Sequence, residues 1–346
     1  TFRVDVNIEV DLIEEIARIY GYDKIPLASP SYHSSTRPHA PVFLFERAVR
    51  QRLLSEGLQE LLTCDLVGPS ALQVINGDGP LDSLTVEVMN PTSIEQSCLR
   101  TSMLPGLLQV VKVNYDRQNT DIHGFEVGRV HFRDGEKFRE EAVAGIVLSG
   151  KNVPHHWDEK PRALDFFDIK GIIENLLGEF AVSNVVYKNT QKSVFHTGRQ
   201  ASIFVGDLEI GSMGEIHPAI IRRLDIPQRV FFAEVDLKDL FSVGRDEHKM
   251  KPLCNFPGSE RDWTLTMKEK TPVESVSSVI RNVDSTLLED FHVLDIYRSA
   301  KLGQGIKNVT FRFVYRDKTK TIAQEAVDQE HARITDKVRS LLINLE

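Results

Sequence analysis

The chain has 346 residues, of which 41% are hydrophobic and 27% charged, proportions typical of a folded soluble protein. This length exceeds one ordinary hydrophobic core and predicts two or three domains. The formal net charge of −8 argues against a broad basic surface for nucleic acid, and no run of about eighteen apolar residues predicts a membrane-spanning helix.

Two periodicities follow one another in residues 2–26. Apolar side chains occupy every second position from Phe2 to Ile8, which predicts a half-buried strand over residues 2–9. From Asp11 the apolar spacing becomes helical, and Gly21 can end the predicted helix.

This stretch is also rich in carboxylates, and two interpretations of them stay open. Asp11 and Glu14 have the spacing of a capping box, and acids in a first turn suit the helix dipole. Alternatively, Asp5 at a strand end and Asp11, Glu14 and Glu15 in the first turn could surround one magnesium ion. The two interpretations are compatible, because a carboxylate can cap with one oxygen and bind metal with the other.

The central part begins after a linker rich in proline and serine at 27–41. Hairpins with long helices between them predict an antiparallel α+β sheet. A charged linker at 245–251 closes this part. The predicted helices cover residues 43–58, 105–117 and 165–177, and the predicted strands cover residues 61–67, 84–89, 124–132, 142–148, 201–216 (a hairpin about Gly206-Asp207) and 231–237.

No catalytic constellation emerges from the sequence. P-loop, GxGxxG and GxSxG motifs are absent. His155 and His156 could suggest a metal pair, but adjacent strand residues point to opposite faces and no HExxH helix accompanies them. The remaining candidates are expected to be turn, cap or solvated residues, namely His196, His217, Asp165, Asp168 and Lys170.

The three cysteines, Cys64, Cys98 and Cys254, are widely spread and lack CxxC spacing. This pattern favours a reducing cytosol and argues against a zinc site or a disulfide scaffold. No signal peptide is recognised. Because the chain opens on Thr1 inside a predicted strand, we expect it to be a piece of a longer protein.

The last third, from Lys251, carries fifteen lysines and arginines against fourteen acids, so its net charge is +1 and the remainder carries −9. If RNA is bound, this third is the less repulsive part. Its order β-α-β-β-α predicts a ferredoxin-like split βαβ arrangement that lacks the final strand. Trp263, Phe311 and Phe313 are expected in its core. The predicted strands begin near Trp263 and cover 287–297 and 308–315, and the predicted helices cover 273–281 and 321–345.

The run Asp5-x5-Asp11-x2-Glu14-Glu15, followed by Ile-Ala-Arg-Ile-Tyr-Gly-Tyr-Asp-Lys-Ile-Pro26, resembles the β subunit of bacterial phenylalanyl–tRNA synthetase. The resemblance implies that Asp5, Asp11, Glu14 and Glu15 bind magnesium at a position shared with the α subunit.

The middle of the chain is similar to the catalytic-like module of the same subunit, which has the class II synthetase sheet but no active site. The likeness lies in Asn90-Pro91, Leu99-Arg100, residues 104–108 and residues 125–128. Neither Phe-Arg-x-Glu nor Gly-Leu-Gly-x-x-Arg, whose arginines hold ATP in a working class II site, is present. Glu126-Val-Gly-Arg129 is the nearest relic, and its arginine is expected to cap or pair structurally.

The last third resembles the ferredoxin-fold anticodon-binding domain of that subunit, through Phe256-Pro257, residues 294–298, residues 303–307 and the 312–321 hairpin. Family members usually end with one more short strand, so we expect that this strand is either shortened in this protein or lies after Glu346. The resemblance implies tRNA contacts at strand ends and loops, although each such residue could also be an ordinary solvated charge. The candidates are Tyr297, Arg298, Lys301, Lys307, Arg316, Lys318 and Lys320.

The expected fold class is therefore α+β. Residues 1–28 would end a magnesium-binding strand-helix domain, and residues 29–250 would form an antiparallel, catalytically degenerate class II synthetase-like domain. Residues 251–346 would form a ferredoxin-like anticodon-binding domain.

The function implied by the resemblance is that of the C-terminal part of a phenylalanine–tRNA ligase β subunit. It would assemble with an α subunit as α2β2, bind tRNA(Phe) and be cytoplasmic, with ATP bound on α and this chain inactive alone. The alternative is a free-standing RNA-binding or assembly module. A metal-dependent hydrolase is disfavoured, because no nucleophile or base accompanies the acidic cluster.

Overall fold

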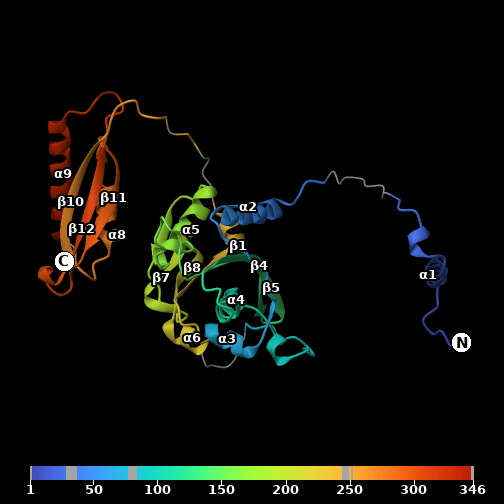
Figure 1. The fold of residues 1–346 in the computed structure, drawn as a ribbon. Coiled ribbons are helices and arrows are strands. Elements are labelled where there is room, and N and C mark those ends of the chain that lie inside the picture. Colours follow the sequence, from blue (N-terminus) through green and yellow to red (C-terminus); the bar gives the residue numbers. More distant parts are fainter. Residues whose placement is uncertain (1, 29–36, 77–83, 244–248, 251, 344–346) are drawn as a thin grey trace. The chain divides into compact units, whose positions relative to one another are not determined.

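The computed structural model describes residues 2–28, 37–76, 84–243, 249–250 and 252–343. The chain divides into two compact units, residues 1–248 and 249–346 (Figure 1). Most of the two expected linkers, at 27–41 and 245–251, lies outside the described residues.

The N-terminal stretch contains helix α1 (Glu9–Tyr20) and the short 3-10 helix η1 (Tyr22–Lys24). Gly21 ends α1 with a φ of 102°, a conformation that favours glycine. The strand predicted over residues 2–9 is wrong, because residues 2–8 are irregular. A strand is stable only when a neighbour accepts its backbone hydrogen bonds, and no described strand pairs with these residues.

A seven-stranded sheet in the order β1-β4-β5-β9-β8-β7-β6 forms the centre of the first unit. β1 runs parallel to β4, and the other neighbours are antiparallel. The predicted antiparallel α+β arrangement is confirmed. The strands are β1 (Gln59–Glu60), β4 (Ile122–Asp134), β5 (Lys137–Ser149), β6 (Val185–Lys188), β7 (Phe195–Val205), β8 (Leu208–Ile216) and β9 (Val230–Asp236).

Both faces of this sheet are covered by helices. In β5, Ala144 and Ile146 belong to one core cluster, whereas Val143 and Val147 belong to a second, as the strand alternation requires. Helices α2 (Pro41–Ser55), α5 (Phe166–Glu179) and α7 (Leu237–Ser242) contribute to the first cluster, and α4 (Leu104–Asp116) and α6 (Pro218–Arg223) contribute to the second.

Two further strand predictions are corrected. The strand expected over residues 61–67 is largely wrong: β1 ends at Glu60, before this range begins, and within the range only Leu66–Val67 forms a strand. The segment 84–89 makes only an isolated bridge between Glu87 and Cys98. Asn90 then turns with a φ of 55° before a proline, which stops the pairing. The small elements of this region are β2 (Leu66–Val67), α3 (Pro69–Asn76), the 3-10 helix η2 (Ile94–Gln96) and β3 (Cys98–Leu99).

The second unit is a three-stranded antiparallel sheet in the order β10-β12-β11. Trp263, Phe311 and Phe313 are buried in its core, as predicted. The alternation of β12 explains this, since every second residue packs against the helices. Its elements are β10 (Ser259–Lys268), α8 (Val273–Arg281), β11 (Leu288–Tyr297), the 3-10 helix η3 (Ala300–Leu302), β12 (Ile306–Tyr315) and α9 (Gln324–Ile343).

Within the described ranges, none of the helices combines the length and apolar character needed to cross a membrane.

Candidate functional site

The acidic N-terminal junction is organised around Arg3. Its guanidinium donates to both oxygens of Asp5, at 2.9 and 2.6 Å, and to Glu15 at 2.8 Å. The other oxygen of Glu15 accepts from Arg18. These hydrogen bonds lower the pKa of Asp5 and of Glu15 to about 2 each. Two of the four predicted metal ligands therefore share one guanidinium.

The other two predicted ligands behave differently. One oxygen of Asp11 accepts the backbone N–H groups of Asn7 at 2.8 Å and Ile8 at 2.9 Å, so Asp11 caps the start of α1. Glu14 is exposed and has no hydrogen-bond or ion-pair partner among the described residues. The oxygen donors suit magnesium by their chemistry. The described residues nevertheless gather no three histidine, cysteine or acidic side chains around a common point.

A buried carboxylate lies on the central sheet, where the sequence offered a relic of a catalytic strand. Glu126 is 1% exposed and accepts hydrogen bonds from Arg100 at 2.8 Å and from the hydroxyl of Thr63 at 2.7 Å. Arg100 is itself buried and also pairs with Asp65 at 2.5 Å. Arg129 pairs with Glu46 at 2.8 Å, which confirms its structural role. Each charged side chain of this cluster therefore forms an ion pair with another residue of the chain.

The same sheet face is filled by the segment that precedes α4. Met103 is fully buried, and a Cβ added at Gly128 or Gly145 would lie 2.7 or 2.6 Å from its side chain. Glu234 accepts from the hydroxyl of Ser102 at 2.9 Å and from the backbone N–H of Met103 at 2.7 Å. Burial raises the pKa of Glu234. The part of the face around Met103, Gly128 and Gly145 is thus packed interior.

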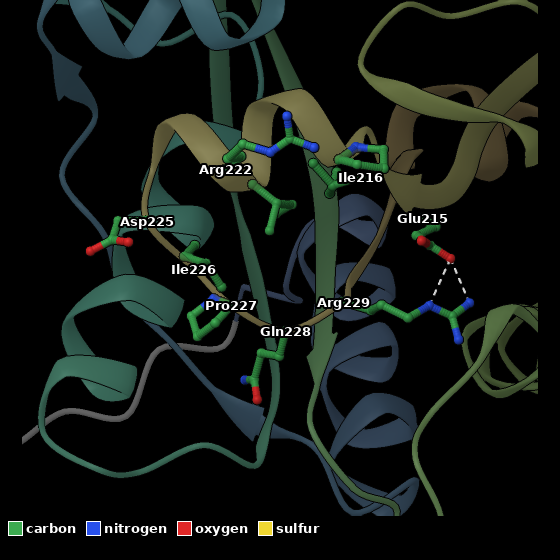
Figure 2. Close-up of a pocket in the computed structure, with 10 residues that line it drawn as sticks. Glu215, Ile216, Arg222, Asp225, Ile226, Pro227, Gln228 and Arg229 are labelled. Atoms are coloured by element: carbon green, nitrogen blue, oxygen red, sulfur yellow. Dashed lines mark hydrogen bonds and ion pairs between the residues drawn. The ribbon is translucent and has the colours of Figure 1, made fainter.

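A second buried carboxylate, which the sequence reasoning missed, lies where β7, β8 and β9 meet. Glu215 is 4% exposed and accepts from Arg199 at 2.6 Å and from Arg229 at 2.5 Å. Burial would raise the pKa of Glu215, but the hydrogen bonds from Arg229 and Arg199 lower it below its ordinary value. Glu215 and Arg229 also line a hollow of about 410 Å³ beside α6 (Figure 2). No sequence motif signals this cluster, because sheet pairing alone brings its members together.

The predicted RNA-binding residues of the second unit fall into two groups. Tyr297 ends β11 with 53% of its surface exposed. Arg298 follows it and makes a two-pronged ion pair with Glu269, at 3.1 and 2.8 Å. Lys301 lies in η3 and is exposed. These three candidates lie at one end of the sheet, at and just after the end of β11.

The remaining candidates lie on β12 and in the segment after it. Lys307 is 6% exposed, and its ammonium donates to the backbone carbonyls of Glu269 and Thr271, at 2.9 Å each. Arg316 donates to Glu289 at 2.7 Å, whereas Lys318 and Lys320 are exposed in the segment before α9. The side chain of Lys307 therefore supports a loop from inside the domain.

Asp295 and Asn308, two polar residues near Tyr297, were not predicted from the sequence to contact RNA. Tyr297 lies opposite Asn308 in the sheet, and Asp295 lies opposite Thr310. Because Val309 belongs to the core, its neighbours on β12 face the other side of the sheet. This open face therefore places hydrogen-bonding groups beside an exposed aromatic ring, and single-stranded RNA is read by stacking and by hydrogen bonds to base edges.

Models of three known protein families match successive parts of the chain. A model described as phenylalanyl tRNA synthetase beta chain CLM domain matches residues 25–237. A ferredoxin-fold anticodon binding domain model matches residues 254–344, and a tRNA synthetase B5 domain model matches residues 1–22. The chain belongs to the phenylalanyl-tRNA synthetase β chain family. The family assignment and the α+β fold class made from the sequence are confirmed.

Curated relatives of this β chain family agree over almost the whole chain. A phenylalanine–tRNA ligase beta subunit from Protochlamydia amoebophila is 53% identical over 99% of the chain, and one from Geobacter sulfurreducens is 33% identical over 98%. The chain spans 43% of the length of each. A solved pyrrolysyl tRNA synthetase from Desulfitobacterium hafniense matches 58% of this chain and 68% of its own, with 16% identity and a TM-score of 0.47. That similarity is too weak to support a conclusion.

Proposed function

We propose that the chain is the C-terminal part of a phenylalanine–tRNA ligase β subunit, and that its second unit holds tRNA(Phe) while ATP-dependent attachment of phenylalanine takes place. The observation that carries this proposal is the anticodon-binding domain match over residues 254–344, together with an exposed aromatic ring and cations at one end of that domain's sheet. The packing of the sheet face around Met103 supports the proposal that this chain is inactive without its partner.

The RNA-binding surface that we infer is centred on Tyr297, whose ring offers a stacking platform for one base. Asp295 and Asn308 would bond the edge of that base, and Arg298 and Lys301 would approach its phosphates. Lys307 is omitted because its ammonium is buried. Arg316, Lys318 and Lys320 follow the opposite end of β12 from Tyr297, so they would form a second, separate group of RNA contacts.

Replacing Tyr297 with alanine is expected to weaken binding of tRNA(Phe) by about ten- to a hundredfold, because base stacking on an aromatic contributes about 1–3 kcal/mol. Fluorescence anisotropy with labelled tRNA measures this. Tyr297→Phe should bind like the parent chain. Tyr22→Ala is the matched control, since Tyr22 is also exposed, at 60%, but lies in the first unit. Equal affinities for Tyr297→Ala and Tyr22→Ala would refute the proposed surface.

We also infer an α subunit as the partner, in an α2β2 assembly in the cytoplasm, with ATP bound on α. The long match to β subunits supports this. Co-expression with a phenylalanyl–tRNA synthetase α subunit should yield a complex on size-exclusion chromatography. Failure of the full-length β chain to co-elute would favour a free-standing RNA-binding module instead.

Magnesium binding by Asp5, Asp11, Glu14 and Glu15 remains part of the proposal. We expect it to be weak in this chain, with a dissociation constant on the order of 1 mM, because Arg3 already neutralises two of the carboxylates. Calorimetric titration of magnesium chloride into the chain measures it. A micromolar dissociation constant would contradict this expectation.

A further inference from the structure

Lys307 is a buried cation without a carboxylate partner. It is 6% exposed, and its position in the alternation of β12 places it on the side of the sheet that packs against the helices. Its ammonium donates to the backbone carbonyls of Glu269 and Thr271, at 2.9 Å each, and forms no ion pair with a described residue. Burying a charge is costly, and an apolar side chain of similar length would fill the same space, so packing alone does not explain this lysine.

Both carbonyls belong to the loop that joins β10 to α8. The backbone N–H of Glu269 donates to the carbonyl of Gly305 at 2.7 Å, and that of Thr271 donates to the carbonyl of Lys268 at 3.1 Å. The loop is therefore fixed from inside the domain by Lys307 and at its start by Gly305.

The carboxylate of Glu269 connects this loop to the end of β11. It accepts from Nε of Arg298 at 3.1 Å and from Nη2 at 2.8 Å, and these hydrogen bonds hold the pKa of Glu269 below its ordinary value. Arg298 directly follows β11, whose last pair with β12 joins Tyr297 to Asn308. Among the described strands β12 is the only neighbour of β11, and two irregularities interrupt their pairing. The ion pair therefore holds a strand end that has few other restraints.

We propose that Glu269 and Lys307 are positioning residues for RNA binding: Lys307 fixes the β10–α8 loop, and Glu269, through Arg298, fixes the end of β11 that carries Tyr297. The inference rests on the proposed function, because Tyr297 is the stacking platform of that function. Neither positioning residue touches RNA. Ordering side chains at the moment of binding costs free energy, and a strand end that is already fixed avoids this cost.

Glu269→Gln gives the sharpest test, because charge and position predict opposite results. If only charge matters, removing a carboxylate beside an RNA-binding surface strengthens binding. The positioning role predicts instead that Glu269→Gln weakens binding of tRNA(Phe) by the full chain about two- to tenfold, measured by fluorescence anisotropy with labelled tRNA.

Glu274→Gln is the matched control, since Glu274 is also exposed and pairs with an arginine of the same unit, Arg281. It removes the same charge and should bind tRNA no more weakly than the parent chain. An affinity of Glu269→Gln equal to or above that of Glu274→Gln would overturn the inference.

Lys307→Met tests the inner contact. It should weaken tRNA binding by a similar factor but keep the parent slope of log affinity against log salt, because the ammonium neutralises no phosphate. A slope lowered by about one would show that Lys307 itself contacts a phosphate, and would overturn the positioning role. The fluorescence of Trp263 in urea shows whether the variant is folded under the binding conditions. Glu269→Gln keeps the test decisive if Lys307→Met unfolds, because the side chain of Glu269 is 42% exposed.

A double variant tests whether the effect passes through Tyr297. Adding Glu269→Gln to Tyr297→Ala should cause no further loss of affinity, since both changes act on the same ring. Additive losses would overturn the inference. It would also be overturned, alone, if Tyr297→Ala weakened binding while Glu269→Gln and Lys307→Met bound like the parent chain. A parent chain that binds no tRNA would instead overturn the proposed function itself.

Discussion

Replacing Arg100 with methionine is expected to lower the free energy of unfolding of the first unit by about 3–5 kcal/mol, because it leaves the buried carboxylate of Glu126 without its cation. The same guanidinium also donates to the hydroxyl of Thr63 and the backbone carbonyl of Arg129, at 2.9 Å each. Methionine fills similar space but offers no donor to any of these groups. Urea denaturation followed by circular dichroism measures the change.

Arg139→Met is the matched control, since the side chain of Arg139 is 54% exposed and its ion pair with Glu141 is screened by water. It should alter stability by less than about 0.5 kcal/mol. Adding Glu126→Gln to Arg100→Met removes the unpaired charge and should recover part of the loss. Equal effects of Arg100→Met and Arg139→Met would show that the buried pair contributes no more than a surface pair.

Replacing Phe313 with alanine is expected to destabilise the second unit by about 3–5 kcal/mol, a large share of the 5–15 kcal/mol typical of a domain. Phe313 is fully buried, and its ring lies 6.1 Å from that of Phe291, 6.3 Å from that of Tyr315 and 5.2 Å from that of His331. Removing it takes contacts from all three at once. The fluorescence of the buried Trp263 in rising urea measures the transition, and affinity for tRNA(Phe) should fall with it.

The control for this substitution is Phe138→Ala, because Phe138 is 72% exposed in the first unit. It should leave both the Trp263 transition and tRNA affinity unchanged. If Phe313→Ala unfolded at the urea concentration of the parent chain, the aromatic cluster would not be the core of the second unit.

Local sequence patterns were sufficient to predict strands with one buried face and tight turns. The alternation of β12 predicted the burial of Phe311 and Phe313, and Gly206-Asp207 predicted the β7–β8 hairpin. Such features depend on residues a few positions apart, which is the range over which periodicity and turn chemistry act. The segments 2–9 and 84–89 have the same alternation but do not form strands of a sheet. Strand formation also needs a neighbouring strand of sufficient length.

The acidic N-terminal junction likewise combines features that are visible in the sequence with contacts that only the folded structure shows. The carboxylates were evident from the sequence, but the capping box predicted for Asp11 and Glu14 is wrong. Helix α1 begins at Glu9, so Asp11 is its third residue and accepts the backbone N–H groups of Asn7 and Ile8, whereas Glu14 takes no part. That Arg3 would bridge Asp5 and Glu15 was not predictable from spacing, since the contact depends on how the irregular residues 2–8 fold back toward the helix. Spacing identifies oxygen donors, but it does not specify which cation they meet.

The sequence by itself determined the family and the α+β class, and it predicted the residues that we propose to bind RNA in the second unit. Only the tertiary structure decided which charges remain available there and elsewhere. It buried Lys307, paired Arg100 with Glu126, and joined Arg199 and Arg229 on Glu215. The physical reason is that a charged side chain forms an ion pair or stays available according to its neighbours in space. Sheet pairing brings together residues that no local sequence pattern connects.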